Sequence, residues 1–186
     1  MKIAIQGIKG SYHHQVATEF FDDKIQLDEC LSFDKLIDSL NNDVSEFGVM
    51  AIENSIAGSI IPNYSLIDKN NLYIIGEYYI NINHNLMVYP GVDLNQIKIV
   101  SSHPMALLQC KDYLKKIDKT IVEDKDTAEV AKRIIENKLL DTAAIASVEA
   151  SKLYGLDIIE RNIQTINDNE TRFVVFSKQH EKKVIS

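Results

Sequence analysis

Short apolar segments typical of strands alternate with amphipathic helical segments along nearly the whole chain. The apolar segments, with β-branched residues or period-two patterns, predict strands at 2–6, 47–52, 72–82, 85–89, 96–101, 142–146, 158–163 and 172–176. Segments with apolar residues at helical spacing predict helices at 11–21, 33–40, 60–67, 103–117, 128–136 and 147–154. Because strands that alternate with helices build layered folds, we expect an α/β protein with largely parallel sheets.

The bulk properties limit the classes of partner. The chain has 186 residues, 45% of them hydrophobic, which is enough for one domain or two small lobes with a real core. Its net charge of −7 argues against non-specific nucleic-acid binding, which depends on clustered Lys and Arg. No apolar run approaches the ~20 residues of a membrane span. We therefore expect no nucleic-acid or membrane partner.

The cysteines and the first residues bear on the compartment. Cys30 and Cys110 have neither metal-site nor CxxC spacing, so we expect two buried free thiols in a reducing compartment. Residues 1–7 are short and resemble a strand more than a signal peptide. Together these features favour the cytoplasm.

Common cofactor motifs do not fit the sequence. Gly7–Ser11 has neither the GxGxxG pattern nor the lysine placement of a Walker motif. His13 and His14 are adjacent and would point apart on a helix, and His84 and His103 lack a nearby set of metal-ligating residues. We expect no metal site and no nucleotide cofactor. A Ser-His-Asp triad stays open, although there is no nucleophile elbow.

Small hydroxyl residues recur where a strand gives way to a helix. They are Ser11, Ser55 with Ser59, Ser102 and Ser147. Helix N-termini carry unpaired N–H groups and a positive dipole end, so such positions suit an anion. For any single one of them, ordinary helix capping is the favoured explanation.

Two internal segments present polar side chains at the margin of an apolar element. Glu53-Asn54-Ser55 ends an apolar strand abruptly, which either presents an amide and a hydroxyl to a ligand or forms a capped turn. Gln109 lies on a helix beside its core-facing stripe, so it requires a polar partner, a ligand or partial exposure to solvent.

The third candidate is Thr171-Arg172-Phe173, where a polar loop enters an apolar strand. Arginine is scarce, with Arg133, Arg161 and Arg172 against seventeen lysines. The guanidinium is a planar fork suited to a carboxylate or phosphate. The alternative is an arginine exposed on an edge strand.

Taken in order, these segments resemble the catalytic domain of prephenate dehydratase over essentially the whole chain. The departures from the usual family pattern are Ile8, His13, Ala51 and Met105. The motifs that carry the resemblance are Gly7–Tyr12, Gly48–Ser59, Gly76-Glu77, His84-Asn85-Leu86, Ser102-His103-Pro104 through Gln109-Cys110, Thr127-Ala128, Ala143–Ser147, Leu153–Leu156 and Thr171-Arg172-Phe173.

The resemblance implies two α/β lobes around a cleft, similar to type II periplasmic binding proteins. It places the first lobe at 1–75 plus 164–186 and the second at 76–163. The implied reaction is loss of water and carbon dioxide from prephenate to give phenylpyruvate in phenylalanine synthesis, with no cofactor. It also suggests a homodimer or homotetramer.

The resemblance also implies roles for individual residues. Catalytic roles fall to Thr171, Asn54 and Gln109, with Thr171 a positioned donor or relay. The substrate-binding residues it implies are Arg172, Phe173, Ser11, Tyr12, Ser55, Gly58, Ser102 and Thr127.

Two other functions stay open. One is an arogenate dehydratase, which acts on the amino analogue, and the other is a two-lobe ligand-binding module without catalysis. Many family members carry a C-terminal phenylalanine-binding ACT domain. The sequence ends at Ser186 without one, which is expected either of a protein that lacks it or of a truncated chain.

Overall fold

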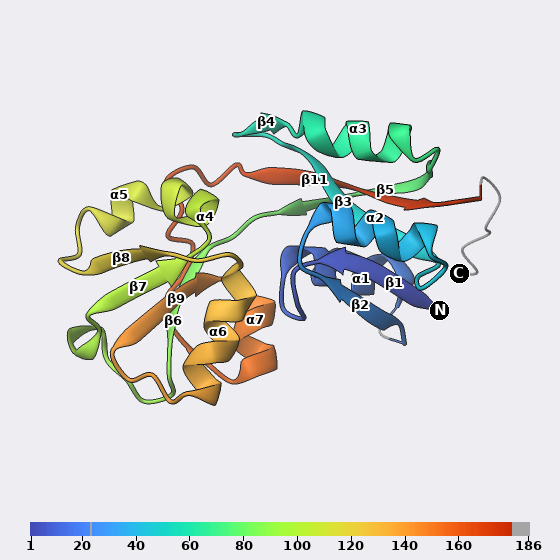
Figure 1. Cartoon of the computed structure of the whole chain (residues 1–186). Coiled ribbons are helices and arrows are strands. Elements are labelled where there is room, and N and C mark those ends of the chain that lie inside the picture. Colours follow the sequence, from blue (N-terminus) through green and yellow to red (C-terminus); the bar gives the residue numbers. More distant parts are fainter. Residues whose placement is uncertain (23, 180–186) are drawn as a thin grey trace. The chain divides into compact units, whose positions relative to one another are not determined.

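The computed structural model describes residues 1–22 and 24–179, which form two compact units, each built on its own sheet (Figure 1). Unit 1 comprises residues 1–8, 12–81 and those from 168 onward, and unit 2 comprises residues 9–11 and 82–167. The chain therefore leaves unit 1 several residues later than the boundary expected at 75/76. The chain re-enters unit 1 at residue 168, which is later than the boundary expected at 163/164. Residues 180–186 of the expected first lobe lie outside the described residues.

The sheet of unit 1 has the strand order β2-β1-β3-β11-β5, with β4 paired to β3. Its strands are β1 Lys2–Gln6, β2 Gln26–Cys30, β3 Phe47–Asn54, β4 Gly58–Ser59, β5 Tyr73–Asn81 and β11 Glu170–Ser177. Strands β2, β1 and β3 run parallel, while β11 lies antiparallel between β3 and β5. β11, the last strand of the described residues, thus completes the first sheet.

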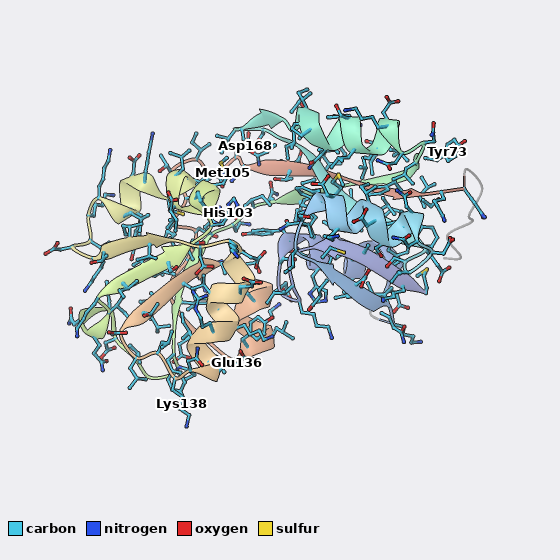
Figure 2. All side chains as sticks on the ribbon, in the orientation of Figure 1. Tyr73, His103, Met105, Glu136, Lys138 and Asp168 are labelled. Carbon is cyan, nitrogen blue, oxygen red and sulfur yellow. The ribbon has the colours of Figure 1, made fainter. Side chains whose placement is uncertain are left out.

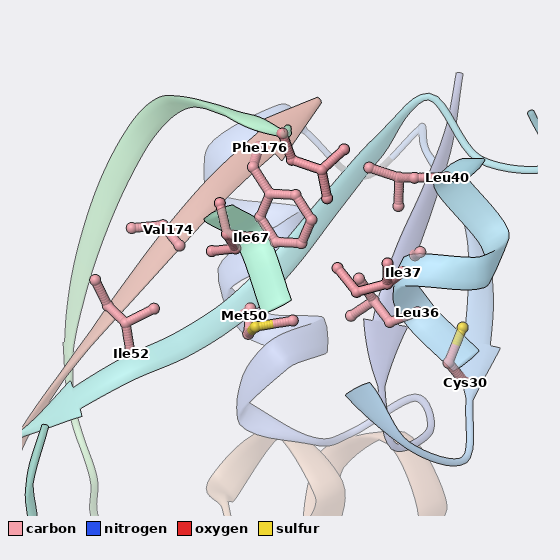
Figure 3. Close-up of a cluster of buried hydrophobic side chains, with 11 residues drawn as sticks. Cys30, Leu36, Ile37, Leu40, Met50, Ile52, Ile67, Val174 and Phe176 are labelled. Carbon is pink, nitrogen blue, oxygen red and sulfur yellow. The ribbon is translucent and has the colours of Figure 1, made fainter. Parts of the chain in front are cut away.

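Helices pack on both faces of this sheet: α1 Tyr12–Phe21, α2 Phe33–Asn41 and α3 Ile61–Lys69. Met50, Val174 and Phe176 point to one face and form a buried core with Leu36 of α2 and Ile67 of α3 (Figure 3). On the other face, the ring of Phe21 in α1 contacts Phe47 in β3. Alternating residues of β3 and β11 therefore serve two separate cores, as expected for strands buried on both sides.

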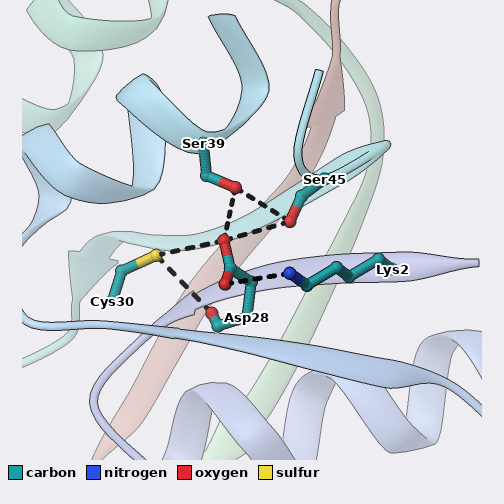
Figure 4. A network of polar contacts seen from close by, with 5 residues as sticks. All are labelled: Lys2, Asp28, Cys30, Ser39 and Ser45. Atoms are coloured by element: carbon teal, nitrogen blue, oxygen red, sulfur yellow. Dashed lines mark hydrogen bonds and ion pairs between the residues drawn. The ribbon is translucent and has the colours of Figure 1, made fainter. Parts of the chain in front are cut away.

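A polar cluster joins the edge strand β2 to α2 (Figure 4). The Asp28 carboxylate accepts hydrogen bonds from the hydroxyls of Ser39 and Ser45 and forms an ion pair with Lys2. Burial raises the pKa of Asp28, but these hydrogen bonds and the nearby ammonium outweigh burial and hold the pKa below its ordinary value. The cluster therefore gives the partly buried Asp28 carboxylate hydrogen-bond donors and a counter-charge near the edge of the sheet.

The sheet of unit 2 has the order β10-β6-β9-β7-β8. Its strands are β6 Asn85–Val88, β7 Ile99–Ser102, β8 Thr120–Glu123, β9 Thr142–Ala146 and β10 Asp157–Glu160. The helical segments are η1 Leu94–Gln96, α4 Pro104–Gln109, α5 Lys111–Leu114, α6 Thr127–Glu136 and α7 Val148–Tyr154. β7, β8 and β9 are parallel, whereas β6 is antiparallel to both β9 and β10.

The fold differs from the sequence predictions in three ways. Both sheets are mixed, because β11 and β6 run against their neighbours, so the expectation of largely parallel sheets is wrong. The strands β2, β4 and β8 are absent from the sequence predictions. The expected helix over 103–117 is divided into α4 and α5 at Cys110. Among the residues described, no helix has the length and apolar character needed to cross a bilayer.

Candidate functional site

A bulge at the end of β3 brings Asn54 to Thr171. Thr171 lies opposite Asn54 and Arg172 opposite Glu53, but Phe173 lies opposite Ala51, so Ile52 has no residue facing it on β11. Simple alternation along β3 would place Asn54 on the same face as Ile52, which belongs to the core below α2 and α3. The extra residue changes that alternation, and the amide of Asn54 meets the hydroxyl of Thr171.

The side-chain amide of Asn54 is held at both ends. Its Oδ1 accepts from the backbone N–H groups of Ile56 at 3.0 Å and Ala57 at 2.9 Å. Its Nδ2 donates to Oδ1 of Asn169 at 2.7 Å, to Oγ1 of Thr171 at 2.8 Å and to a backbone carbonyl at 3.2 Å. Asn54 and Thr171 are 8% and 7% exposed, so this cluster has little contact with water. The sequence predictions placed both in the site, and the structure brings them into contact.

Ser55 ties the loop before β11 to the end of β3. Its hydroxyl donates to the carbonyl of Asp168 at 3.4 Å and accepts from the N–H of Glu170 at 2.9 Å. Its own N–H donates to the carbonyl of Glu170 at 2.8 Å. Ser55 does not begin a helix, so the expected helix-start anion site is wrong at this position. The chain continues instead through a tight hairpin into β4.

Gly58 closes that hairpin. It pairs with Asn54 across three intervening residues and has φ +80°, a left-handed conformation that glycine adopts without strain. Ser59 lies in β4, and α3 begins two residues later with Pro62 in its first turn and no side-chain cap. Ser59 therefore precedes α3 without capping it, while the helix expected over 60–67 is present.

Arg172 lies on the other face of β11 from Thr171, as neighbouring strand residues do. Two of its guanidinium nitrogens bond both carboxylate oxygens of Glu77, at 2.8 and 3.2 Å, and a third lies 3.6 Å from Glu53. Its Cζ lies 6.0 Å from the ring centre of Tyr79. The Arg172 hydrogen bonds hold the pKa of Glu77 below its ordinary value. The fork expected to bind a substrate carboxylate is thus occupied by carboxylates of the chain itself.

Phe173 and His13 pack together on the α1 face. Their ring centres are 5.0 Å apart in an edge-on arrangement, and Phe33 lies 5.7 Å from the His13 ring. The Nε2 of His13 accepts from the N–H of Ala51 at 3.4 Å. Burial lowers the pKa of His13 to about 4, so the ring is neutral near pH 7. Phe173 is only 2% exposed, and alternation along β11 puts it on the same face as Thr171.

In unit 2, Gln109 is paired with His84. The ring atom Nε2 of His84 lies 2.8 Å from Oε1 of Gln109. The backbone N–H of His84 donates to Oε1 of Gln164 at 3.0 Å. Burial lowers the pKa of His84, opposed in part by the hydrogen bond with Gln109, so the neutral ring donates to that oxygen. The pairing directs the amide NH₂ of Gln109 away from His84. The backbone carbonyl of Gln109 accepts from the backbone N–H of Thr165 at 2.8 Å.

The remaining predicted residues of unit 2 have structural partners. Ser102 donates to the carbonyl of Ile145 at 2.6 Å, so it does not cap α4 as expected. His103 caps α4 instead, accepting from the N–H of Met105 at 3.2 Å; Met105 is 42% exposed (Figure 2). Ser11 is buried at 4% exposure.

Two further helix starts of unit 2 have side-chain caps. Asp126 accepts from the N–H groups of Ala128 and Glu129, which places Thr127 first in α6. Ser147 caps α7 by accepting from the N–H of Ala150 at 3.1 Å, and its hydroxyl donates to the carbonyl of Gly10 at 2.9 Å. Tyr12, the last predicted site residue, begins α1 in unit 1.

A cavity of about 380 Å³ lies elsewhere in unit 1, between β2 and α2. Its lining includes Asp28, Cys30 and Lys35 but neither Asn54 nor Thr171. In residues 1–22 and 24–179, no three His, Cys, Asp or Glu side chains gather closely enough to hold a metal ion. The candidate residues therefore lie in two separate places, the Asn54–Thr171 cluster in unit 1 and the Gln109–His84 pair in unit 2.

These arrangements agree with a comparison against protein-family models, in which residues 3–181 match the model for prephenate dehydratase. The chain belongs to the prephenate dehydratase family. It is 37% identical over 180 residues to a bifunctional chorismate mutase/prephenate dehydratase of Buchnera aphidicola subsp. Acyrthosiphon pisum (strain APS), covering 95% of this chain and 47% of that protein. It is 36% identical over 179 residues to the chloroplastic arogenate dehydratase/prephenate dehydratase 2 of Arabidopsis thaliana, covering 96% and 47%. The chain spans about half the length of these relatives.

Solved structures agree with the fold. A chain described as GqqA, a novel type of quorum quenching acylase, has a TM-score of 0.83 at 29% identity, covering 97% of this chain and 65% of that one. Prephenate dehydratase from Arthrobacter aurescens in complex with L-Phe has a TM-score of 0.87 at 22% identity, covering 97% and 61%. A periplasmic substrate-binding protein from Coxiella burnetii has a TM-score of 0.50 at 13% identity, covering 96% and 84%. These likenesses confirm the predicted fold class, an α/β fold similar to prephenate dehydratases and periplasmic binding proteins.

Sequence reasoning missed three residues that contact the predicted ones: Asn169, Glu77 and His84. Asn169 is fully buried and stands two residues before Thr171, a spacing that in a strand puts two side chains on the same face. Glu77 and His84 lay within recognised motifs, but nothing in the sequence paired them with Arg172 and Gln109. Those pairings join segments 95 and 25 residues apart.

Proposed function

We propose that this chain catalyses the decarboxylating dehydration of prephenate to phenylpyruvate, a hydro-lyase step of phenylalanine biosynthesis. The observation that carries the proposal is the hydrogen bond from Asn54 to Thr171, found within a family match that covers residues 3–181. A hydroxyl that accepts this bond still has its own proton to donate, as the departing hydroxyl of the substrate requires.

The chemistry needs a donor where negative charge develops. Prephenate loses carbon dioxide and its ring hydroxyl together, and with one added proton the products are phenylpyruvate, carbon dioxide and water. Thr171 donates a hydrogen bond to the departing oxygen, which stabilises charge in the transition state. An alcohol is a weak acid, so Thr171 acts as a positioned donor or relay. Formation of an aromatic ring supplies the driving force.

The other predicted residues have supporting roles in this proposal. Arg172 binds a substrate carboxylate by exchanging Glu77 or Glu53, its partners in the structure, for the ligand. Gln109, oriented by His84, donates through its amide NH₂. Phe173 contributes a dry wall that favours decarboxylation. The remaining substrate-binding candidates are Ser11, Tyr12, Ser55, Gly58, Ser102 and Thr127.

The test is phenylpyruvate formation from prephenate by the purified chain, with EDTA present and no cofactor added. Thr171→Val keeps the shape of the side chain but removes the hydroxyl, so we expect kcat to fall by about 10²–10³-fold. Thr171→Ser restores a hydroxyl and should recover much of the rate. Near-normal turnover by the valine variant, in a protein with wild-type thermal stability, would contradict the assignment.

Because relatives of this chain are named for different activities, the test includes a comparison of substrates. The Arabidopsis protein is described as acting on arogenate and prephenate, so kcat/KM for the two compounds should be measured side by side. We propose prephenate as the preferred substrate; a higher kcat/KM for arogenate would make the chain an arogenate dehydratase. Tight prephenate binding without turnover would support a binding module.

We further propose a cytoplasmic location and a homodimer or homotetramer. Cys30 and Cys110 are both buried free thiols, as is common in reducing compartments. Light scattering coupled to size-exclusion chromatography measures the assembly directly, and a monomer at micromolar concentration would contradict the second proposal.

A further inference from the structure

Asn169 is completely buried at the point where the chain enters β11. The residues on either side of it are bound to Ser55: the Asp168 carbonyl accepts from the Ser55 hydroxyl, and the Glu170 N–H donates to it. These bonds hold the backbone around Asn169 against the end of β3. Its side-chain Oδ1 lies 2.7 Å from Nδ2 of Asn54.

The contacts of Asn54 determine which end of its amide faces Thr171. Oδ1 accepts from two backbone N–H groups, those of Ile56 and Ala57. A flipped amide would set its NH₂ against those two donors and its oxygen against the oxygen of Asn169. Both contacts would be repulsive in a buried cluster. The oxygen of Asn169 therefore favours the one orientation in which Asn54 donates to Thr171.

The direction of the Thr171 hydroxyl follows from the protons of the Asn54 amide. Nδ2 of Asn54 has two protons and three acceptors: the two shorter contacts, to Asn169 at 2.7 Å and to Oγ1 of Thr171 at 2.8 Å, and a longer one to the Glu170 carbonyl at 3.2 Å, which shares one of these protons. An amide nitrogen only donates, so the contact with Thr171 runs from Asn54 to the hydroxyl. Oγ1 thus accepts from Asn54, and its own proton must point elsewhere. Without the oxygen of Asn169, the amide of Asn54 loses one of the contacts that orient it.

We propose that Asn169 is a positioning residue for Thr171, because its side-chain oxygen orients the Asn54 amide so that the Thr171 hydroxyl donates to the substrate. The inference rests on the proposed dehydratase function and adds a residue that does not touch the reacting atoms. It predicts a loss in kcat with little change in KM, since the substrate contacts are retained.

The first experiment compares Asn169→Ala with two other variants. We expect Asn169→Ala to lower kcat about tenfold, the order of one lost oriented hydrogen bond, with KM within about twofold of wild type. Asn169→Asp keeps an acceptor oxygen and should retain more activity than the alanine variant. Asn63→Ala is the matched control, because Asn63 is 2% exposed and donates to the Ala51 carbonyl without reaching Thr171. An equal loss of kcat in Asn63→Ala, or kcat within about twofold of wild type in Asn169→Ala, would overturn the inference.

A double-mutant cycle tests whether Asn169 acts through Asn54. Adding Asn169→Ala to an Asn54→Ala background should lower kcat no further, because the amide to be oriented is already absent. A further tenfold loss would show that Asn169 acts by another route and would overturn the inference.

An NMR measurement separates this inference from the dehydratase assignment. Exchange of the Asn54 side-chain amide protons with water should be slow in wild type, faster in Asn169→Ala and unchanged in Asn63→Ala. Unchanged exchange in Asn169→Ala would overturn the inference whatever the turnover. A wild-type chain that does not convert prephenate refutes the proposed function instead, and the exchange data still decide whether Asn169 holds the amide.

Discussion

The amide of Asn54 donates to the hydroxyl of Thr171 across β3 and β11 at 2.8 Å, and this contact depends on one unopposed residue, Ile52. The bulge turns Asn54 away from the apolar core, while its Oδ1 caps the turn that follows. The same side chain thus closes a hairpin and sets the role of the hydroxyl. These two functions can be separated by a substitution of Asn54 that keeps the acceptor for the turn but replaces the NH₂ donor facing Thr171 with an acceptor.

Asn54→Asp is that change. One carboxylate oxygen can still accept from the turn N–H groups, but the other now faces Thr171 as an acceptor. The Thr171 proton is then drawn toward the introduced carboxylate and away from the substrate, so we expect kcat to fall by at least about tenfold. Protonation restores a donor, so the ratio of variant to wild-type kcat should rise as the pH is lowered. Steady-state kinetics at several pH values measure both effects.

Asn54→Ala serves as the control for the aspartate variant, because it removes the donor without adding a titrating group. Its kcat relative to wild type should be low and independent of pH over the same range. An aspartate variant whose relative kcat is also independent of pH would contradict the proposed reversal of the hydrogen bond.

The sequence analysis predicted the strands that have apolar patterns. The strands that it missed are polar and lie at the edges of the sheets. β3 has seven of its eight residues buried, and β9 is buried throughout. β2 and β8 lie at the edges of their sheets, and every residue of β8 is exposed. Edge strands are stabilised by backbone pairing to one neighbour, so their side chains need not alternate. The direction of β11 was equally hidden, since strand patterns do not encode orientation.

The sequence likewise identified some residues of the candidate site but not the residues that they contact. Asn54 and Thr171 could be selected by type and motif, but the pairing of Arg172 with Glu77 depends on the register of β11 against β5. Ser102 preceded a helical pattern, yet its hydroxyl bonds a neighbouring strand and His103 takes the cap. Local sequence gives the candidates, whereas long-range register determines their partners.

Glu77→Gln tests whether Arg172 binds a substrate carboxylate. The substitution removes the charge that occupies the guanidinium fork but keeps the shape of the side chain. If substrate exchanges with Glu77, weaker competition should lower KM severalfold, with a smaller effect on kcat. Arg172→Lys should raise KM because the bidentate fork is lost. Michaelis–Menten measurements on both variants decide, and an unchanged KM in each would contradict carboxylate binding by Arg172.

His13 should make the folded state less stable in acid. Burial lowers its pKa from 6.5 to about 4, so the unfolded chain takes up a proton at a higher pH than the folded chain. The free energy of unfolding should therefore decrease as the pH falls from 6.5 to about 4, with no further contribution from this residue below that. His13→Gln keeps an acceptor side chain but does not titrate. In this pH window, the slope of its unfolding free energy against pH should be smaller than that of wild type. The difference should correspond to the uptake of at most about one proton on unfolding.

Urea unfolding at several pH values measures the slope for His13→Gln and for Phe33→Leu. The leucine variant loses packing against the His13 ring but keeps the histidine, so its slope should stay close to wild type. Equal slopes in wild type and His13→Gln would contradict the assignment of this proton to His13.

Gly48 tests how tightly β3 and β11 share the core below α2. A Cβ at this position would lie 2.6 Å from the Phe176 ring and 2.9 Å from Leu36, closer than atoms can pack without movement. The backbone of Gly48 is not left-handed, so the penalty arises from packing rather than from φ. We expect Gly48→Ala to destabilise the protein by about 1–3 kcal/mol, measured by urea unfolding.

Phe176→Leu provides the rescue that distinguishes overpacking from other effects. Alone it should destabilise, because it removes part of a fully buried ring. Combined with Gly48→Ala it makes room for the new methyl group, so the double variant should lose less stability than the sum of the two single changes. Additive losses would show that the methyl group is accommodated elsewhere and that the ring does not limit the space at Gly48.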